Sequence, residues 1–329
     1  MKVVVPVIVV VIHILPEGPL DILIGSFILF NQCIYKVDEH LQDNHGTSKR
    51  QTAKELPAHW SGDDLRKSLY GQRIASETIL NAVTWFMKDP DPPKPRVLSL
   101  LGPTGVGRTY IMKIIARNIY EKGENSKHVH TLIATYQFVY KIEAQFKAWI
   151  YGNVPSFPRS MFIFDEMDKM NPHLIETIKP FLDYMPHVDR VSFNNAILIF
   201  LSGAGTNMIH KVALDFWRKG KERDELHMNT EGMETKLYQT FFNDKYSGFW
   251  HSCLIDEHLV DHFVPFLPLE LKHLKQCVLA EMTNMNITHD YDVMDSMLKY
   301  MPFFPPEEEA FSIKGCKTIH NKLGLHIRL

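Results

Sequence analysis

The sequence LSLLGPTGVGRTY, residues 98–110, decides the fold of this 329-residue chain. Its apolar start, together with the preceding Val97, predicts a buried strand that ends at Leu101, and isoleucines at helical spacing after residue 110 predict a helix. A glycine-rich loop joins the two. Backbone N–H groups exposed in such a loop, with the unpaired N–H groups of the next helix, form a cradle for an anion such as a polyphosphate.

The loop follows a known phosphate-binding pattern with one exception. The pattern is Gly, four residues, Gly, Lys, then Ser or Thr. Gly102, Gly107 and Thr109 fit it, but Arg108 stands where lysine belongs. A glycine-rich turn can also be no more than a tight connection, and the loop alone does not decide between the two interpretations.

A second signal follows at Met161 to Phe164, four apolar residues that end in Asp165 and Glu166. This pattern predicts a buried parallel strand whose tip presents acids where ligands of open α/β sheets bind. The first acid would hold Mg²⁺ and the second would polarise an attacking water. The alternative is a strand that merely leaves the core into solvated charges, and the glycine loop upstream argues against it.

Strands alternating with helices predict the fold class. The apolar run Ala196 to Leu201 is expected to be the strand next to the acidic one. We therefore predict a doubly wound parallel sheet. From Val212 onward no strand alternation persists, so we expect a mostly helical second domain.

The N-terminal region carries two apolar runs, Val3 to Leu15 and Ile22 to Tyr35. The first is typical of a secretory signal core, although no cleavage site is obvious. The second is shorter than the about 20 residues a spanning helix needs, and we expect it to lie in or on a membrane leaflet. A buried helix of the folded domain is the alternative. The predicted divisions are signal-like and membrane-associating segments at 1–37, a polar linker at 38–64, a large nucleotide-binding domain at 65–211, and its remainder with a small helical domain at 212–329.

The charge balance and the number of cysteines limit which partners and how many disulfides we expect. Thirty-six basic residues against 38 acidic ones give a formal charge of −2, so nothing in the balance points to nucleic acid. Four cysteines are too few and too scattered for a disulfide scaffold, but one pair could still be bridged in an oxidising compartment.

The chain resembles the torsin family, the lumenal AAA+ ATPases related to the Clp-type unfoldases, from about Leu69 to Leu325. The resemblance implies an α/β AAA+ P-loop fold with a smaller C-terminal helical domain. It also implies a place in the endoplasmic reticulum and nuclear envelope lumen, and a role in protein or membrane remodelling. It rests on YGQ at 70–72, the glycine loop, IFDEMDKM at 163–170, IKPFLDY at 178–184, VALDFWRKGK at 212–221, SGFWHSCLID at 247–256, VPFLPLE at 264–270 and KGCK at 314–317.

The resemblance also implies roles for single residues, with ATP and Mg²⁺ as cofactors. Gly71 and Gln72 would lie beside the adenine, Thr109 and Asp165 would hold Mg²⁺, and Glu166 would be catalytic by orienting the hydrolytic water. Lys317 matches the family's sensor-2 lysine, and Cys277 and Cys316 match a redox-sensitive cysteine pair. The residues that would surround the phosphates are Gly102, Pro103, Thr104, Gly105, Val106, Gly107, Arg108, Thr109 and Tyr110.

Two departures from the family concern catalysis. Arg108 replaces the family's lysine, and its broad planar fork cannot sit as a compact point charge between phosphate oxygens. Gly203 stands where the family has its sensor-1 asparagine and has no side chain to sense a γ-phosphate. Ser202 is the one neighbour that could compensate, but its side chain is expected to point to the other face of the strand. We expect weaker nucleotide binding, slower hydrolysis or both.

Other differences concern partners. The resemblance implies a membrane-anchored activator of the lamina-associated polypeptide type, whose lumenal domain supplies an arginine finger. Lys299-Tyr300 replaces paired glutamates of the family in the region that meets the activator, and opposite charge changes both encounter and specificity. Asn286-Ile287-Thr288 is a new glycosylation sequon. A homo-oligomer is a further expectation.

Two functions remain open. One is a slow, activator-dependent ATPase that uses Glu166, and the other is a pseudo-ATPase that binds partners without efficient hydrolysis. A purely structural membrane-associated protein is disfavoured because the acidic pair Asp165-Glu166 is intact.

Overall fold

The computed structural model describes residues 65, 67–133, 143–154, 159–188, 190–228, 232–244, 247, 249–250 and 252–326. The chain divides into two compact units, Met1–Thr52 and Ala53–Leu329, and all described residues belong to the second. The predicted N-terminal apolar segments and polar linker lie outside the described residues. Among the described helices, none is both long enough and apolar enough to cross a membrane.

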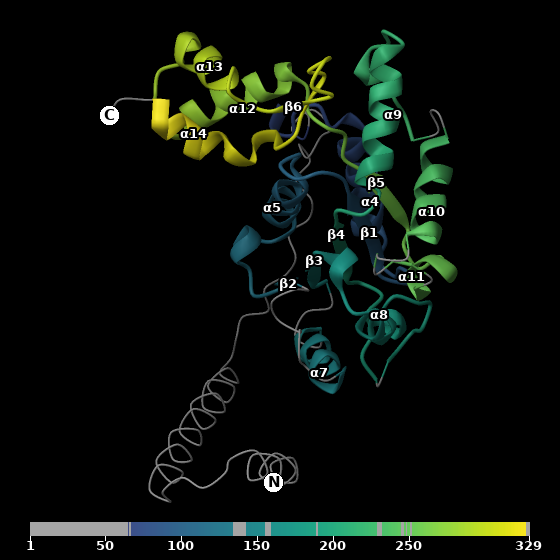
Figure 1. Ribbon diagram of the computed structural model, residues 1–329. Coiled ribbons are helices and arrows are strands. Elements are labelled where there is room, and N and C mark those ends of the chain that lie inside the picture. The colour runs from purple at the N-terminus through teal and green to yellow at the C-terminus, as the bar shows by residue number, and fades with distance from the viewer. Residues whose placement is uncertain are drawn as a thin grey trace, which may run out of the picture. The chain divides into compact units, whose positions relative to one another are not determined.

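A five-stranded parallel sheet forms the centre of the second unit (Figure 1). Arg96–Leu101, Met161–Asp165 and Ile197–Ser202 are strongly apolar and almost wholly buried, as strands covered on both faces are. Their order across the sheet is β2 (Val129–Ile133), β3 (Met161–Asp165), β4 (Ile197–Ser202), β1 (Arg96–Leu101) and β5 (His262–Pro265).

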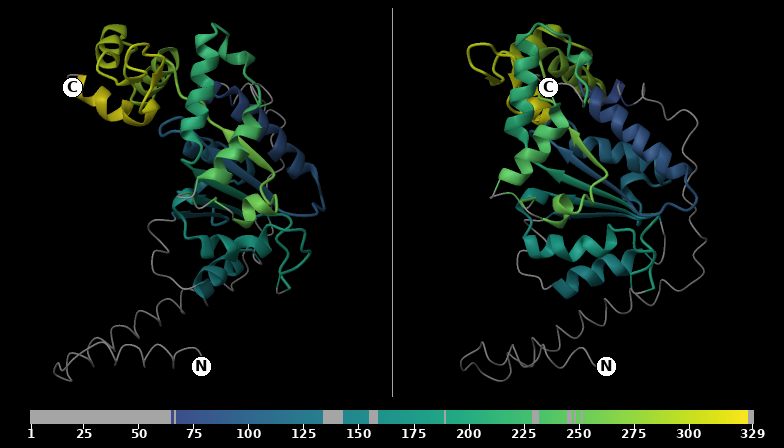
Figure 2. Two further views of the ribbon diagram at one scale, coloured as in Figure 1. Left: turned by 45° about the vertical axis from the view of Figure 1, so that its right-hand side comes forward. Right: turned by 90° about the vertical axis from the view of Figure 1, so that its right-hand side faces the viewer.

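Helices cover both faces of the sheet (Figure 2). Alternate residues of one strand enter different cores: Phe162 and Phe164 pack in one, Met161 and Ile163 in the other. The second core includes the buried faces of α4 (Arg73–Lys88) and α5 (Arg108–Ile119). The other helices of the sheet region are α7 (Glu143–Asn153), α8 (Pro172–Ile178), α9 (Thr206–Arg218), α10 (Met233–Asn243) and α11 (Cys253–Asp256), with short 3-10 turns η2 (Gly123–Asn125), η3 (Met167–Lys169), η4 (Lys179–Phe181) and η5 (Arg223–Glu225).

The C-terminal region forms a smaller helical group with its own apolar core. Leu274, Met297 and Leu323 are among the side chains buried in that core. This arrangement, together with the sheet, confirms the predicted α/β fold class. The elements of the group are α12 (Leu271–Asn284), α13 (Tyr291–Leu298), β6 (Phe303–Phe304), β7 (Phe311–Ser312), η7 (Gly315–Thr318) and α14 (Ile319–His326).

One strand of the sheet was missed. The sequence showed no strand alternation after Val212, yet His262–Pro265 forms β5 and pairs in parallel with β1. The strand has only four residues and a proline at its end, which sheets tolerate at an edge. A run this short carries too little alternation to be recognised from the sequence.

Candidate functional site

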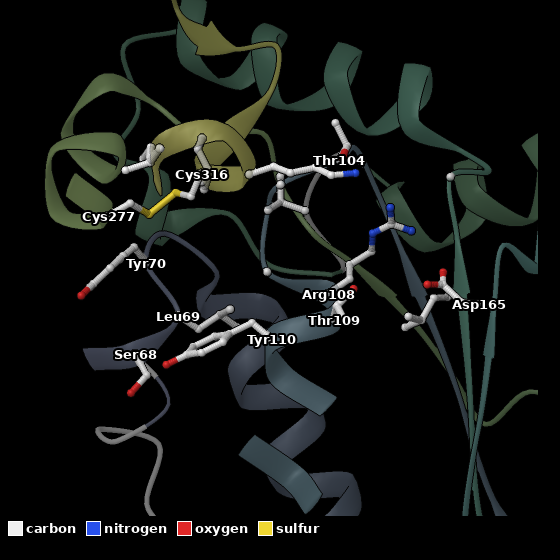
Figure 3. Close-up of a pocket in the computed structure, with 18 of the residues that line it drawn as sticks. Ser68, Leu69, Tyr70, Thr104, Arg108, Thr109, Tyr110, Asp165, Cys277 and Cys316 are labelled. Atoms are coloured by element: carbon white, nitrogen blue, oxygen red, sulfur yellow. A yellow bond between two sulfur atoms is a disulfide. The ribbon is translucent and has the colours of Figure 1, made fainter. Parts of the chain in front are cut away.

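A cavity of about 970 Å³ lies at the carboxyl ends of the central strands (Figure 3). Its volume is in the range of small-molecule sites. The glycine loop, the tips of β3 and β4, residues 67–70 and the C-terminal helical group all contribute to its lining. Elements distant in sequence therefore meet at one place, the edge where open α/β sheets bind ligands.

The glycine loop has the geometry of an anion cradle. Gly107 caps α5 in the left-handed conformation, with φ of 104°, and makes no side-chain cap. The first N–H groups of α5 consequently have no partner within the helix. Gly105 has φ of 75°, and a Cβ there would come within 2.1 Å of the Lys314 carbonyl oxygen. Only glycine permits this close approach of the loop to the C-terminal group.

Most of the predicted loop residues line the cavity, but two do not. Residues from Thr104 to Tyr110 line it. Gly102 and Pro103 are buried beneath, and the Gly102 N–H donates to the Ser202 carbonyl oxygen at 3.3 Å. That bond fixes the start of the loop to the end of β4.

The acidic residues are held at the tip of β3. The Glu166 N–H donates to Asp165 Oδ1 at 2.8 Å, and Glu166 has a left-handed backbone with φ of 58°. Lys169 Nζ lies 2.8 Å from Glu166 Oε1, and this hydrogen bond raises the pKa of Lys169. All three residues line the cavity, as does Asp168.

Asp168 is a site residue that the sequence did not single out. Its Oδ1 accepts hydrogen bonds from Ser202 Oγ at 2.9 Å and from the Gly203 N–H at 3.0 Å. Phe200 and Leu201 pack in different cores, on opposite faces of the sheet. Because side chains alternate along a strand, Ser202 lies on the face of Phe200, opposite to that of Leu201. The acid cluster after β3 was the available signal, but only the strand register brings Asp168 to β4.

Arg108 extends from the loop toward the strand tips (Figure 3). As the first residue of α5 it donates a short hydrogen bond from Nη1 to the carbonyl oxygen of Ser202. Burial lowers the pKa of Arg108, whereas the charges of Asp165 and Asp168 raise it. An arginine remains protonated under such conditions.

Gly71 and Gln72 are not among the described residues that line this cavity. Gln72 is buried, and its amide holds backbone groups behind the loop. Nε2 donates to the Leu267 carbonyl at 2.8 Å and to the Val106 carbonyl at 3.3 Å, and Oε1 accepts from the Leu267 N–H at 2.9 Å. The adjoining wall comes instead from Lys67, Ser68, Leu69 and Tyr70, which sequence reasoning did not assign.

The C-terminal group contributes Lys317 and a disulfide to the cavity. Cys277 of α12 and Cys316 of η7 are joined, and both line the cavity beside the exposed Lys317. The Cys316 N–H donates to the Gly105 carbonyl oxygen at 2.9 Å. The disulfide-bearing segment therefore contacts the glycine loop directly.

Two predicted features lie at exposed positions away from the cavity lining. Asn286 follows α12 with a left-handed backbone, φ 55°, and is exposed. Lys299 ends α13, and Tyr300 after it is 70% exposed. Both positions are accessible to a modifying enzyme or a partner.

Comparisons with known proteins identify the relatives. A family profile described as "Torsin" matches residues 29–164, and one described as "Torsin-1A, C-terminal domain" matches residues 269–326. Among solved structures, the S. cerevisiae Hsp104-ADP complex is similar, with a TM-score of 0.56 and 16% identity over 80% of this chain and 47% of that chain. A closed-state reconstruction of Hsp104 with ATPyS and FITC casein has a TM-score of 0.54 and 16% identity, over 79% of this chain and 45% of that chain.

The solved structures and the family profiles support different conclusions. The chain spans about half the length of the Hsp104 chains, and identity is low, so those matches establish the AAA+ fold alone. The family profiles match both the large domain with its glycine loop and the C-terminal group with its disulfide. This chain belongs to the torsin family and is a torsin-like AAA+ protein.

Proposed function

We propose that this chain binds ATP in the cavity at the strand tips and acts as a slow, activator-dependent ATPase. The observation that carries the proposal is the convergence of the glycine loop, the Asp165-Glu166 tip and Lys317 on one cavity. The similar Hsp104 structures are described as complexes with ADP and ATPyS, which supports a nucleotide as the ligand.

Each part of the cavity has a task in this proposal. The loop N–H groups of α5 bind phosphate oxygens, as helix N-termini do. Lys317 approaches the phosphates from the C-terminal group and adds positive charge. Glu166 orients the attacking water, which is the usual role of a residue at this place in such ATPases.

A pseudo-ATPase is the second candidate, and two observations favour it. Gly203 offers only its backbone N–H, which is already bonded to Asp168. Glu166 is ion-paired with Lys169, so positioning water requires that pair to open. A chain limited in this way would hold partners in a nucleotide-dependent manner without efficient turnover.

One experiment separates the two candidates. ATP binding is measured by calorimetry, and hydrolysis is measured with and without the activator's lumenal domain, for wild type and Glu166→Gln. A slow ATPase loses its activator-stimulated turnover in the variant and retains ATP binding. Equal background turnover in both proteins favours the pseudo-ATPase, and absence of ATP binding in both contradicts the proposal.

We further propose a lumenal place of action, in the endoplasmic reticulum and nuclear envelope, with membrane-leaflet contact through the N-terminal apolar segment. Torsin membership supports this location. The activator would supply an arginine finger and contact the exposed Lys299-Tyr300 surface. Restoring acids with Lys299→Glu and Tyr300→Glu should change the affinity for the activator domain in a pull-down titration, and unchanged affinity would contradict the assigned surface.

Glycosylation at Asn286 gives an independent test of location. The residue is exposed within the sequon Asn286-Ile287-Thr288. Treatment of the cell-expressed chain with an N-glycosidase should increase its electrophoretic mobility, and Asn286→Gln should abolish that shift. A wild-type chain with no shift would contradict both glycosylation and the evidence it offers for the lumen.

A further inference from the structure

We infer that the guanidinium group of Arg108 takes the place of Mg²⁺ in this cavity, so that ATP binds equally well with and without the metal ion. The inference rests on the proposed nucleotide binding. It concerns one component of that site, the cation that links the triphosphate to the acidic strand tip.

The position of Arg108 is the first step. Its side chain leaves the start of α5, and Nη1 donates to the carbonyl oxygen of Ser202 at the end of β4. Phe164 of β3 pairs with Phe200 of β4, so Asp165 lies beside the tip of β4 to which Arg108 is attached. The guanidinium group is therefore placed between the loop and the acidic tip (Figure 3).

A second carboxylate is fixed at the same place. Asp168 Oδ1 accepts from Ser202 Oγ at 2.9 Å and from the Gly203 N–H at 3.0 Å, and so it cannot swing away without losing both bonds. Burial lowers the pKa of Arg108, and the negative charges of Asp165 and Asp168 act against that lowering. The guanidinium group stays protonated, as arginine does in proteins. The strand tips thus hold two carboxylates and a permanent cation before any ligand is bound.

The residues of this chain do not fit Mg²⁺ as the family's residues would. Mg²⁺ needs near-octahedral oxygen ligands at about 2.0–2.1 Å and keeps several of its waters. The resemblance assigns it to Thr109 and Asp165, but the guanidinium group is attached beside Asp165. A lysine at this position could place its compact ammonium group near the phosphates and leave Asp165 free for the ion. The broader, planar guanidinium group of arginine lies at the strand tips instead. A divalent ion there would also face a fixed positive charge at short range.

The arginine fork can supply the link that the ion would otherwise make. Guanidinium has five N–H donors, and the Ser202 carbonyl oxygen accepts from one of them. The remaining edge suits paired hydrogen bonds to phosphate oxygens, the geometry in which arginine binds phosphate best. One side chain would then connect the triphosphate with the strand tip. Without a divalent ion to neutralise transition-state charge, hydrolysis would be slow, as in the slow ATPase proposed above.

The test is the affinity for ATP in MgCl₂ and in excess EDTA, measured by titration calorimetry on the full chain. Wild type should show dissociation constants that differ by less than about twofold. Arg108→Lys should bind at least about tenfold more tightly in MgCl₂ than in EDTA, because lysine frees Asp165 for the ion. Arg117→Lys is the matched control on the same helix, since Arg117 is exposed and paired with Glu124 outside the cavity. It should behave as wild type.

Three results would overturn the inference, and they have different meanings. A wild-type chain that loses about tenfold or more of its affinity in EDTA uses the ion despite Arg108. Binding by Arg108→Lys alone would show that the arginine excludes ATP instead of replacing the metal. Absence of ATP binding in both proteins under both conditions would contradict the proposed nucleotide binding itself. The wild-type comparison needs no variant and so does not depend on how well a variant folds.

Discussion

The backbone N–H of Cys316 donates a 2.9 Å hydrogen bond to the carbonyl oxygen of Gly105, so the segment that carries the disulfide rests on the glycine loop. The loop presents the N–H groups proposed to bind phosphate. We therefore expect a change in the covalent state of Cys316 to affect the shape of the anion cradle.

Removing the disulfide should lower both stability and nucleotide affinity. Its cysteines are 39 residues apart, and the chain-entropy model assigns about 4 kcal/mol to a loop of that length. Denaturant unfolding and ATP titration of Cys277→Ser/Cys316→Ser would measure both effects. Dithiothreitol should weaken wild-type binding severalfold and leave the double variant unchanged. An equal response of the two proteins would show that the disulfide does not act on the loop.

Gln72 should prove a structural support of the loop. Gln72→Ala leaves the Leu267 N–H and the Leu267 and Val106 carbonyl groups without their side-chain partner. Buried groups that lose a partner cost about 1–3 kcal/mol, so the free energy of unfolding should fall by about that amount. The control is Gln239→Ala, at an exposed position of α10, which should have little effect. Similar losses in both variants would contradict the assigned role.

His273 should make stability depend on pH. Burial, aided by Arg223 and Lys272, lowers the pKa of His273 to about 3. In the unfolded chain this histidine has an ordinary pKa of about 6.5. Between about pH 3 and about pH 6.5 it therefore binds a proton in the unfolded state but not in the folded state. The free energy of unfolding should therefore fall as pH falls below about 6.5, by up to about 1.4 kcal/mol per pH unit for this group, until about pH 3.

The histidine can be replaced without removing the hydrogen-bond acceptor. His273 Nδ1 accepts from the Glu270 N–H at 3.1 Å, and glutamine offers an oxygen for that bond. Unfolding of His273→Gln between about pH 7 and about pH 5 should show a slope about 1 kcal/mol per pH unit smaller than wild type. His187→Gln, at an exposed position, should keep the wild-type slope. An unchanged slope in His273→Gln would contradict the prediction.

The sequence predicted the parts of the fold that carry strong local patterns. Arg96–Leu101 and Met161–Asp165 are strongly apolar strands that lead into the glycine loop and the acidic pair. The loop from Thr104 to Tyr110 and the pair Asp165-Glu166 line the cavity. β5 could not be predicted, because His262–Pro265 gains its strand conformation from pairing with β1 and not from its own four residues.

Tertiary contacts explain what the sequence did not show at the site. Asp168 reaches Ser202 only because β3 and β4 are neighbours in register. Gln72 was expected beside the adenine, but its amide bonds groups 34 and 195 residues away in the chain. No local pattern specifies such partners. The disulfide between Cys277 and Cys316 was an expectation from family resemblance and could not follow from the spacing of four cysteines.

Restoring the family's residues at two positions should increase turnover. A Cβ at Gly203 would lie 3.7 Å from Asp168 Oδ2, an ordinary contact, so asparagine can be accommodated there. Steady-state hydrolysis with the activator domain should rise by about tenfold or more in Arg108→Lys/Gly203→Asn, since one positioned donor is worth at least that much in a transition state. Wild-type turnover as fast as that of the double variant would show that these positions do not impair the site.

Photolabelling with azido-ATP tests directly whether the cavity at the strand tips binds the nucleotide. We expect saturable labelling that is competed by unlabelled ATP and is mapped by mass spectrometry to the cavity walls at Lys67–Tyr70 or to cavity residues of α12. Absence of saturable labelling, or labelling confined to residues outside the cavity, would contradict it.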